Sequence, residues 1–94
     1  MTNFNQQRVL ELHNRMCMNP ETFSHRWGMN AGEIAAICGI SRSSVSHWLG
    51  GRSSRRTPGG AHLRILAVAD FLLTNAERIQ PLLERWQQPE ESER

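Results

Sequence analysis

The sequence contains no lysine and no tyrosine, and only two of its 94 residues are cysteines, Cys17 and Cys38. Two cysteines cannot build the disulfide framework of a small secreted domain, so we expect both to be small buried apolar residues in a reducing compartment. The first fifteen residues have neither the basic nor the apolar region of a secretory signal. No apolar run approaches the roughly 18–20 residues that span a bilayer. We therefore expect a cytoplasmic protein with no membrane partner.

The types and spacing of the polar residues also exclude several classes of functional site. Without lysine there is no Walker-type phosphate loop. The cysteines and the four histidines include no C-x2-C or H-x3-H pair, so we expect no metal ion. Ser46 and His47 are neighbours in the sequence, and adjacent helix residues point in different directions, so they do not form a nucleophile and base. A chain of this length is one small domain. We expect a binding module without a cofactor, and not an enzyme.

The net charge of +2 is unevenly distributed along the chain. Acidic and basic residues balance over residues 1–40, and acidic residues outnumber basic ones by six to three over 65–94. Residues 41–64 contain no acidic residue, and their cations are Arg42, Arg52, Arg55, Arg56 and Arg64. The planar guanidinium suits bidentate contacts to phosphate and to guanine edges. The segment indicates either a nucleic-acid contact or a solvated basic loop.

Helix signals dominate the first half of the chain. We expect a first helix from about Phe4 to Met18, and a second short helix that Asn19 and Pro20 open and Gly28 ends. Asn30 and Glu33 have the spacing of a capping box before a third helix.

Gly39, Ile40 and Ser41 join this third helix to a fourth with the spacing of a helix-turn-helix motif. Gly39 supplies the positive φ that a turn needs, and Ser41 can cap the next helix. Ala35 is small where the two helices approach most closely. The expected apolar seam between the helices consists of Ile34, Cys38, Ile40, Val45 and Trp48.

Residues 33–49 resemble the helix-turn-helix of bacterial transcription regulators. Trp48-Leu-Gly-Gly is similar to the end of Xre/Cro-type recognition helices, whereas Arg56-Thr-Pro-Gly-Gly-Ala-His-Leu-Arg is similar to the wing of MerR-type domains, with Ala61 as an extra residue. In scale and layout the chain is also similar to the small repressors encoded beside cyanobacterial CRISPR-associated transposons. The resemblance implies a repressor of transcription whose partner is double-stranded DNA, and it leaves the MerR-like and Xre-like alternatives open.

The outward side of the fourth helix is short and polar, as contacts to a major groove require. We expect the base-reading residues to be Arg42, Ser43, Ser44, Ser46 and His47. We expect the DNA backbone to be held by Ser41, Arg52, Arg55, Arg56 and Arg64. A helical hairpin that only packs is the alternative, but it does not explain the basic segment that follows. Residues 50–60 are rich in turn formers, and a short β wing, a linker and a hinge all remain open.

Residues 61–74 are apolar on nearly every side, which is typical of a central core helix. Asp70 interrupts this segment, and we expect it to pair with an arginine or to cap a turn. The predicted core contacts join Leu63, Leu66, Val68, Phe71 and Leu72 to Val9, Leu12, Ile37 and Trp48.

Asn75 can cap a last helix, and Pro81 should kink that helix or mark its true start. Its apolar stripe, which packs either on its own domain or against a second copy, consists of Ile79, Leu82, Leu83 and Trp86. We expect a dimer contact here, because one small module reads too few bases for useful specificity.

These observations together predict an all-α fold: a compact helix-turn-helix domain over residues 1–74, with or without a short β wing, a C-terminal dimerisation helix over 75–88 and a disordered tail over 89–94. The predicted function is sequence-specific repression by a homodimer on DNA. No residues remain for a sensor domain, so no small-molecule effector is expected. The alternative is a protein-interaction module, an adaptor or an antitoxin-like partner, that uses the C-terminal stripe.

Overall fold

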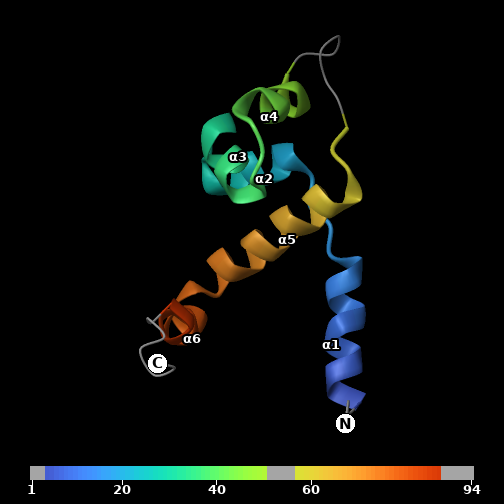
Figure 1. The fold of residues 1–94 in the computed structure, drawn as a ribbon, viewed down its shortest axis with the longest axis vertical. Coiled ribbons are helices and arrows are strands. Elements are labelled where there is room, and N and C mark those ends of the chain that lie inside the picture. The colour runs from blue at the N-terminus through green and yellow to red at the C-terminus, as the bar shows by residue number, and fades with distance from the viewer. Residues whose placement is uncertain (1–3, 51–56, 88–94) are drawn as a thin grey trace, which may run out of the picture.

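The computed structural model describes residues 4–50 and 57–87, and all regular structure in these ranges is helical. The helices, drawn in Figure 1, are α1 (Phe4–Arg15), α2 (Pro20–Trp27), α3 (Ala31–Cys38), α4 (Arg42–Leu49), α5 (Gly60–Thr74) and α6 (Ala76–Gln87). The predicted all-α class is confirmed. The expected wing and the C-terminal tail lie largely outside the described residues, so both stay predictions.

Local signals in the sequence set the ends of the helices. The Asn19 side chain accepts a hydrogen bond from the backbone N–H of Glu21 at 2.7 Å, and Pro20 occupies the first position of α2. Gly28 ends α2 with φ of 62°. The capping box predicted for α3 is present, since Asn30 and Glu33 each bond the other's backbone N–H.

The first helix is shorter than the sequence predicts. It ends at Arg15 rather than near Met18, because the backbone N–H of Met18 donates to the carbonyl oxygen of Leu63 in α5 at 3.0 Å instead of to its own helix. Cys17 therefore lies outside α1 and is exposed, contrary to the buried position that we expected. The connection from α1 to α2 runs along α5.

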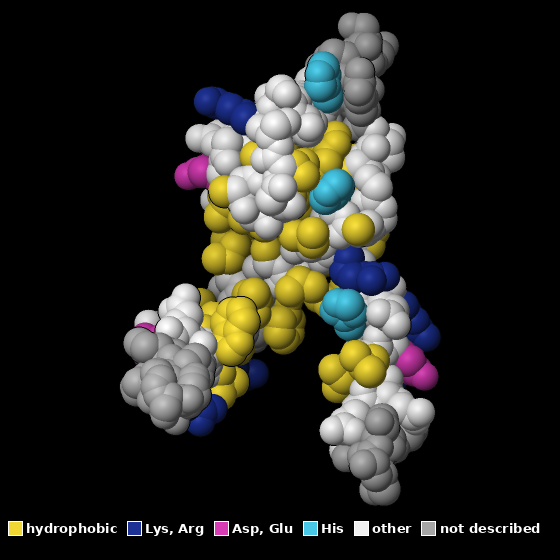
Figure 2. All heavy atoms as spheres, in the orientation of Figure 1, with side chains coloured by type: hydrophobic (Ala, Val, Ile, Leu, Met, Phe, Trp, Pro, Cys, Tyr) yellow, Lys and Arg dark blue, Asp and Glu magenta, His cyan; other side chains and the backbone are white. Residues whose placement is uncertain are grey.

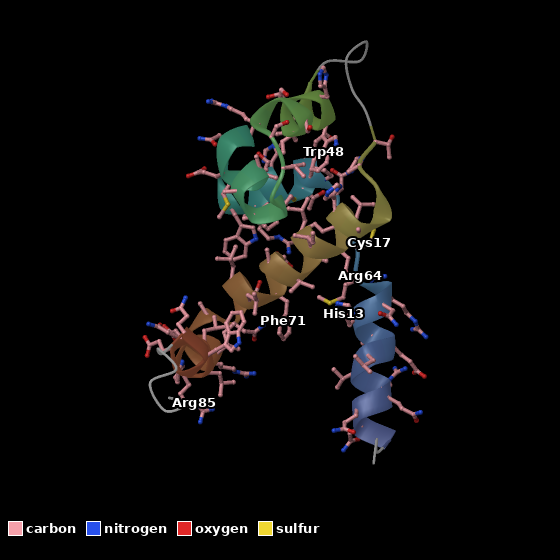
Figure 3. All side chains as sticks on the ribbon, in the orientation of Figure 1. His13, Cys17, Trp48, Arg64, Phe71 and Arg85 are labelled. Carbon is pink, nitrogen blue, oxygen red and sulfur yellow. The ribbon has the colours of Figure 1, made fainter. Side chains whose placement is uncertain are left out.

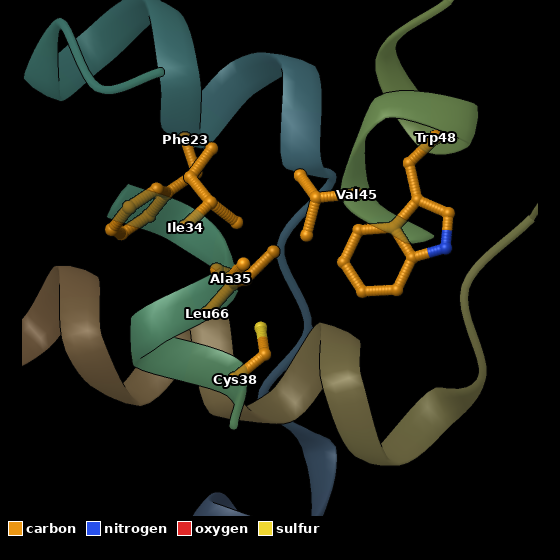
Figure 4. Packing of buried hydrophobic residues seen from close by; sticks show 7 residues of the cluster. All are labelled: Phe23, Ile34, Ala35, Cys38, Val45, Trp48 and Leu66. Carbon is orange, nitrogen blue, oxygen red and sulfur yellow. The ribbon is translucent and has the colours of Figure 1, made fainter. Parts of the chain in front are cut away.

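The core lies where α2, α3 and α4 pack together over the first half of α5 (Figure 4). Phe23, Ile34, Val45 and Leu66 are fully buried. They are joined by Ala35, Cys38 and Trp48. Of the predicted seam, only Ile40 is half-buried rather than buried. Burial raises the pKa of the Cys38 thiol above its usual value, so this cysteine is the inert apolar residue that its position predicts. We call this unit of α2, α3, α4 and residues 60–70 the head.

The second half of α5 leaves the head. Phe71 is 52% exposed, and Val9 and Leu12 of α1 are exposed as well, so the predicted core contacts among these residues are wrong. The reason is length. At 1.5 Å per residue, the 15 residues of α5 extend about 22 Å, whereas each eight-residue helix of the head extends only about 12 Å. The core buries Leu66 and Ala67 and is partly covered by Ala69, whereas the residues from Phe71 to Thr74 are exposed.

Asp70 fixes α5 to the head at the point where the helix departs. Its Oδ1 accepts hydrogen bonds from Arg26 Nη1 at 2.8 Å and from Trp27 Nε1 at 3.0 Å. The expected pairing of Asp70 with an arginine is confirmed. The partners lie in α2, which the sequence did not indicate.

The junction between α5 and α6 differs in detail from the prediction. The Asn75 side chain donates back to the carbonyl oxygen of Phe71 at 2.9 Å, and thus closes α5 instead of capping α6. Pro81 lies inside α6 and does not mark its start. Figure 1 shows α1 and α5 extending from the head in different directions, with α6 at the far end of α5, in an envelope of 50 × 33 × 25 Å. None of the described helices combines the length and the apolar character needed to span a bilayer.

Candidate nucleic-acid interface

Helix α4 has one buried side and one open side. Val45 and Trp48 anchor it in the core, in contact with residues of α2 and α3. The residues predicted to read bases occupy the rest of the helix, and none of them is buried. Arg42, Ser43 and Ser46 are exposed, and Ser44 and His47 are half-buried. The structure thus brings this whole set together on one helix.

The turn before α4 has the geometry that the motif requires. Gly39 has φ of 71°, in the left-handed region, and its N–H donates to the carbonyl oxygen of Ala35 at 2.8 Å. Ala35 is buried where α3 meets α4, as its small size predicts. These two residues set how α4 lies on α3 and which of its side chains point outward.

Hydroxyl groups gather at the start of α4. Ser41 caps the helix by accepting from the N–H of Ser44 at 3.2 Å, and its Oγ lies 2.9 Å from Ser44 Oγ and 3.3 Å from Ser43 Oγ. A hydroxyl can donate once and accept twice, so this network retains capacity for an outside partner. The first turn of α4 contains no acidic residue, and the partial positive charge of a helix N-terminus favours an anion. This end of α4 is suited to a phosphate.

Arg42 starts from the same turn and lies close to α3. A Cβ atom at Gly32 would be 3.8 Å from Arg42 Nε, so the arginine side chain lies beside the start of α3. The guanidinium remains exposed.

The opposite end of α4 contacts the start of α5. The rings of Trp48 and His62 have centroids 5.3 Å apart and are tilted by 44°. A shallow cavity next to them is lined by Ile40, Ser44, His47, Trp48, Thr57, Pro58, Gly59 and His62. No local signal in the sequence places His62 at this site, because the contact joins positions fourteen residues apart.

The structure places Arg64 apart from Ser41 and from the open side of α4. It is half-buried on α5 and donates from Nη2 to the carbonyl oxygen of Asn14 at the end of α1, at 3.0 Å. Figure 3 shows Arg64 beside His13 and away from the outer side of α4. Its observed contacts tie α1 to α5, so we do not retain it in the interface.

The remaining predicted backbone contacts, Arg52, Arg55 and Arg56, lie outside the described residues. The described chain stops at Gly50, directly after α4, and resumes at Thr57 in the cavity beside Trp48. The two described residues that flank these arginines, Gly50 and Thr57, thus both lie next to α4.

The predicted dimer residues lie at the other end of the molecule. Leu82, Leu83 and Trp86 are exposed on α6, and Ile79 is half-buried. Figure 1 shows α6 at the far end of α5 from α4. A contact through α6 would leave the open side of α4 uncovered.

Over residues 4–50 and 57–87, no three histidine, cysteine or acidic side chains come close enough together to hold a metal ion. Comparison of the chain with protein-family models, with curated proteins and with solved structures gave no match. The functional interpretation of the α4 site therefore depends on the geometry of its residues.

Proposed function

We propose that this protein is a cytoplasmic, sequence-specific regulator that binds double-stranded DNA as a homodimer and represses transcription. The observation that carries the proposal is the open side of α4. A helix anchored by Val45 and Trp48 and oriented by the turn at Gly39 presents only short hydroxyl side chains, one arginine and one histidine. A helix of this kind fits the major groove, where base edges offer hydrogen-bond donors and acceptors.

The charges around α4 support the same reading. Arg42, at the start of the helix, can reach the O6 and N7 atoms of a guanine, and the serine network beside it can contact a phosphate. Arg52, Arg55 and Arg56 follow the helix in a segment without acidic residues. Contacts of arginine to phosphate give affinity for any sequence, and the side chains of α4 give the preference among sequences.

A homodimer follows from the small size of the module. Eight residues of α4 reach only a few base pairs, whereas two copies read two half-sites about one helical turn apart. Repression is the simplest regulation for such a chain, because occupation of a promoter needs no further domain.

Selection from a pool of random duplexes tests this proposal. The expected result is an enriched inverted repeat with half-site centres about 10 base pairs apart. The Arg42→Ala variant, selected in parallel, should lose or change the preference at one position of each half-site. Failure of the wild-type protein to enrich any sequence would contradict sequence-specific binding.

The second candidate function is a protein-interaction module, favoured by the 80% exposure of Trp86 on α6. A protein partner whose binding survives the combined loss of Arg52, Arg55 and Arg56, but not the loss of Trp86, would support it.

A further inference from the structure

Large apolar side chains are exposed on three segments outside the head. They are Val9, Leu10 and Leu12 on α1, Phe71, Leu72 and Leu73 at the end of α5, and Leu82, Leu83 and Trp86 on α6. Their exposed fractions range from 36% for Leu72 to 80% for Trp86. With roughly 200 Å² for a large side chain, these nine residues together expose about 900 Å², spread over the three segments. Each partner in a stable complex buries about 800 Å².

Helix α1 in particular has little to stabilise it within one chain. Near its end, Asn14 accepts from Arg64, and Met18, just beyond the helix, bonds Leu63. The exposed Val9, Leu10 and Leu12 lie nearer its free end. An isolated helix of 12 residues is marginal in water, and most helices in proteins depend on packing of their apolar side. A stable α1 therefore needs an apolar surface beyond the head.

The end of α5 and α6 offer such an apolar surface, but within one chain this surface does not contact α1. Figure 2 shows hydrophobic side chains on the side of α1 that faces α6 and on the side of α6 that faces α1, with open space between them. Helices α1 and α5 diverge from the head and α6 lies at the far end of α5, so the two apolar surfaces do not close on each other (Figure 1). A second copy can close both contacts at once, because each copy offers one α1 and one α5–α6 surface. Such a reciprocal contact is the usual form of a two-fold symmetric interface.

The charges beside this surface are compatible with self-association. On α1, Arg8 lies 3.6 Å from Glu11, and on α6, Gln80 donates to Glu84 at 3.0 Å. Both helices carry charges of both signs, so two copies meet without a net repulsion between patches of one sign. A polar rim of this kind around an apolar centre is typical of protein interfaces.

We propose that α1 of one subunit packs on the end of α5 and on α6 of a second copy, and that this contact is made twice in the dimer. The inference rests on the homodimer of the proposed function, but it does not depend on DNA binding. This arrangement differs from a dimer in which α6 packs against α6, because each of its two contacts requires α1 of one subunit.

Complementation between two variants tests the reciprocal contact. Variant one carries Val9→Gln and Leu12→Gln on α1, and variant two carries Leu82→Gln and Trp86→Gln on α6. All four side chains are exposed in the single chain, so the head of each variant should stay folded, as checked by circular dichroism and thermal unfolding. The matched control carries Arg8→Gln and Glu11→Gln, which change two polar positions of α1. Sedimentation velocity of each protein, and of an equimolar mixture of the two variants, gives the masses.

The expected result is a dimeric wild type, a dimeric control and two variants that are each monomeric at the same concentration. The mixture should regain dimers, because the intact α1 of variant two meets the intact α6 of variant one and restores one of the two contacts. If variant one remained fully dimeric, the proposed role of α1 would be wrong, and a dimer through α6 alone would be favoured. Two monomeric variants whose mixture also stays monomeric would overturn the reciprocal arrangement. A wild type that is monomeric at about 100 μM would contradict both this inference and the proposed homodimer, whatever its binding to DNA.

Discussion

The indole of Trp48 and the imidazole of His62 lie with centroids 5.3 Å apart, and this contact joins the end of α4 to the first turns of α5. Trp48 is also one of the two core anchors of α4, so its ring is held on one side by the core and on the other by His62. The contact determines how firmly the C-terminal end of α4 is positioned. It is the part of the site that depends most on residues distant in the sequence.

His62→Ala should therefore weaken the link between α4 and α5. An aromatic pair of this geometry contributes about 0.5–1.5 kcal/mol beyond its buried area. In a domain of this size the loss should lower Tm by several degrees, at about 4–8 °C per kcal/mol. Thermal unfolding followed by circular dichroism measures it. His25→Ala is the matched control, because His25 is exposed on α2 and should leave Tm unchanged. Equal melting of the two variants would show that the ring contact contributes nothing.

Asp70 should matter through its bond to Trp27 more than through its ion pair with Arg26, whose side chain is 50% exposed to solvent. Asp70→Asn keeps an oxygen that can accept from Trp27 Nε1, whereas Asp70→Ala leaves that half-buried donor without a partner. We expect Asp70→Ala to lose about 1–3 kcal/mol of unfolding free energy and Asp70→Asn to lose less. Urea denaturation compares them, and the reverse order would contradict this assignment.

Gly39→Ala should destabilise the turn of the helix-turn-helix by about 1–2 kcal/mol, because φ of 71° brings Cβ close to the following carbonyl oxygen. Gly32→Ala serves as the control within the same helix. A Cβ there would meet Asn30 Oδ1 at 3.4 Å, an ordinary contact, and alanine favours the helix, so this variant should be neutral or stabilised. Gly39→Ala should thus lower the free energy of unfolding, whereas Gly32→Ala should leave it unchanged or raise it. A tolerated Gly39→Ala would contradict the proposed role of the turn.

Arg42→Ala should weaken binding to the selected DNA site by about 1–3 kcal/mol and leave binding to random DNA much less affected. Ser43→Ala should act in the same direction, because its hydroxyl is exposed in the network at the start of α4. Arg8→Ala on α1 is the matched control for the loss of one positive charge. If Arg42→Ala lost as much affinity for random DNA as for the site, Arg42 would be a phosphate contact and not a base-reading residue.

Arg55→Ala, in the segment after α4, should weaken binding to all duplexes alike and reduce the slope of log K against log salt by about one. Fluorescence anisotropy at several salt concentrations measures both quantities. Loss confined to the selected site would assign Arg55 to base reading.

The sequence predicted those parts of the fold that depend on residues a few positions apart. Asn19 with Pro20, Asn30 with Glu33, and Gly39 with Ser41 each act within one helical turn, and the structure contains every one of these caps. The alternation of apolar and polar residues along α4 likewise separates its buried from its open side. For this reason the predicted base-reading residues all lie together.

The sequence could not predict relations between distant segments. The positive charge of Arg64 predicts a contact with DNA, whereas its observed contact with Asn14 spans fifty positions. The apolar side chains of Phe71 and Leu72 predict burial, but the head is too short to cover all of α5. The sequence does predict the apolar stripe of α6, but the exposure of Val9, Leu12 and Phe71 depends on how the helices are arranged.

The most direct test of the central proposal is a titration of the purified protein with the DNA upstream of its own gene and with a shuffled duplex of equal length, at two salt concentrations. We predict a preference of order 10³ or more for the upstream DNA that persists at physiological salt. Equal and steeply salt-dependent binding to both duplexes, or no binding at low salt, would contradict a sequence-specific regulator that acts on its own promoter.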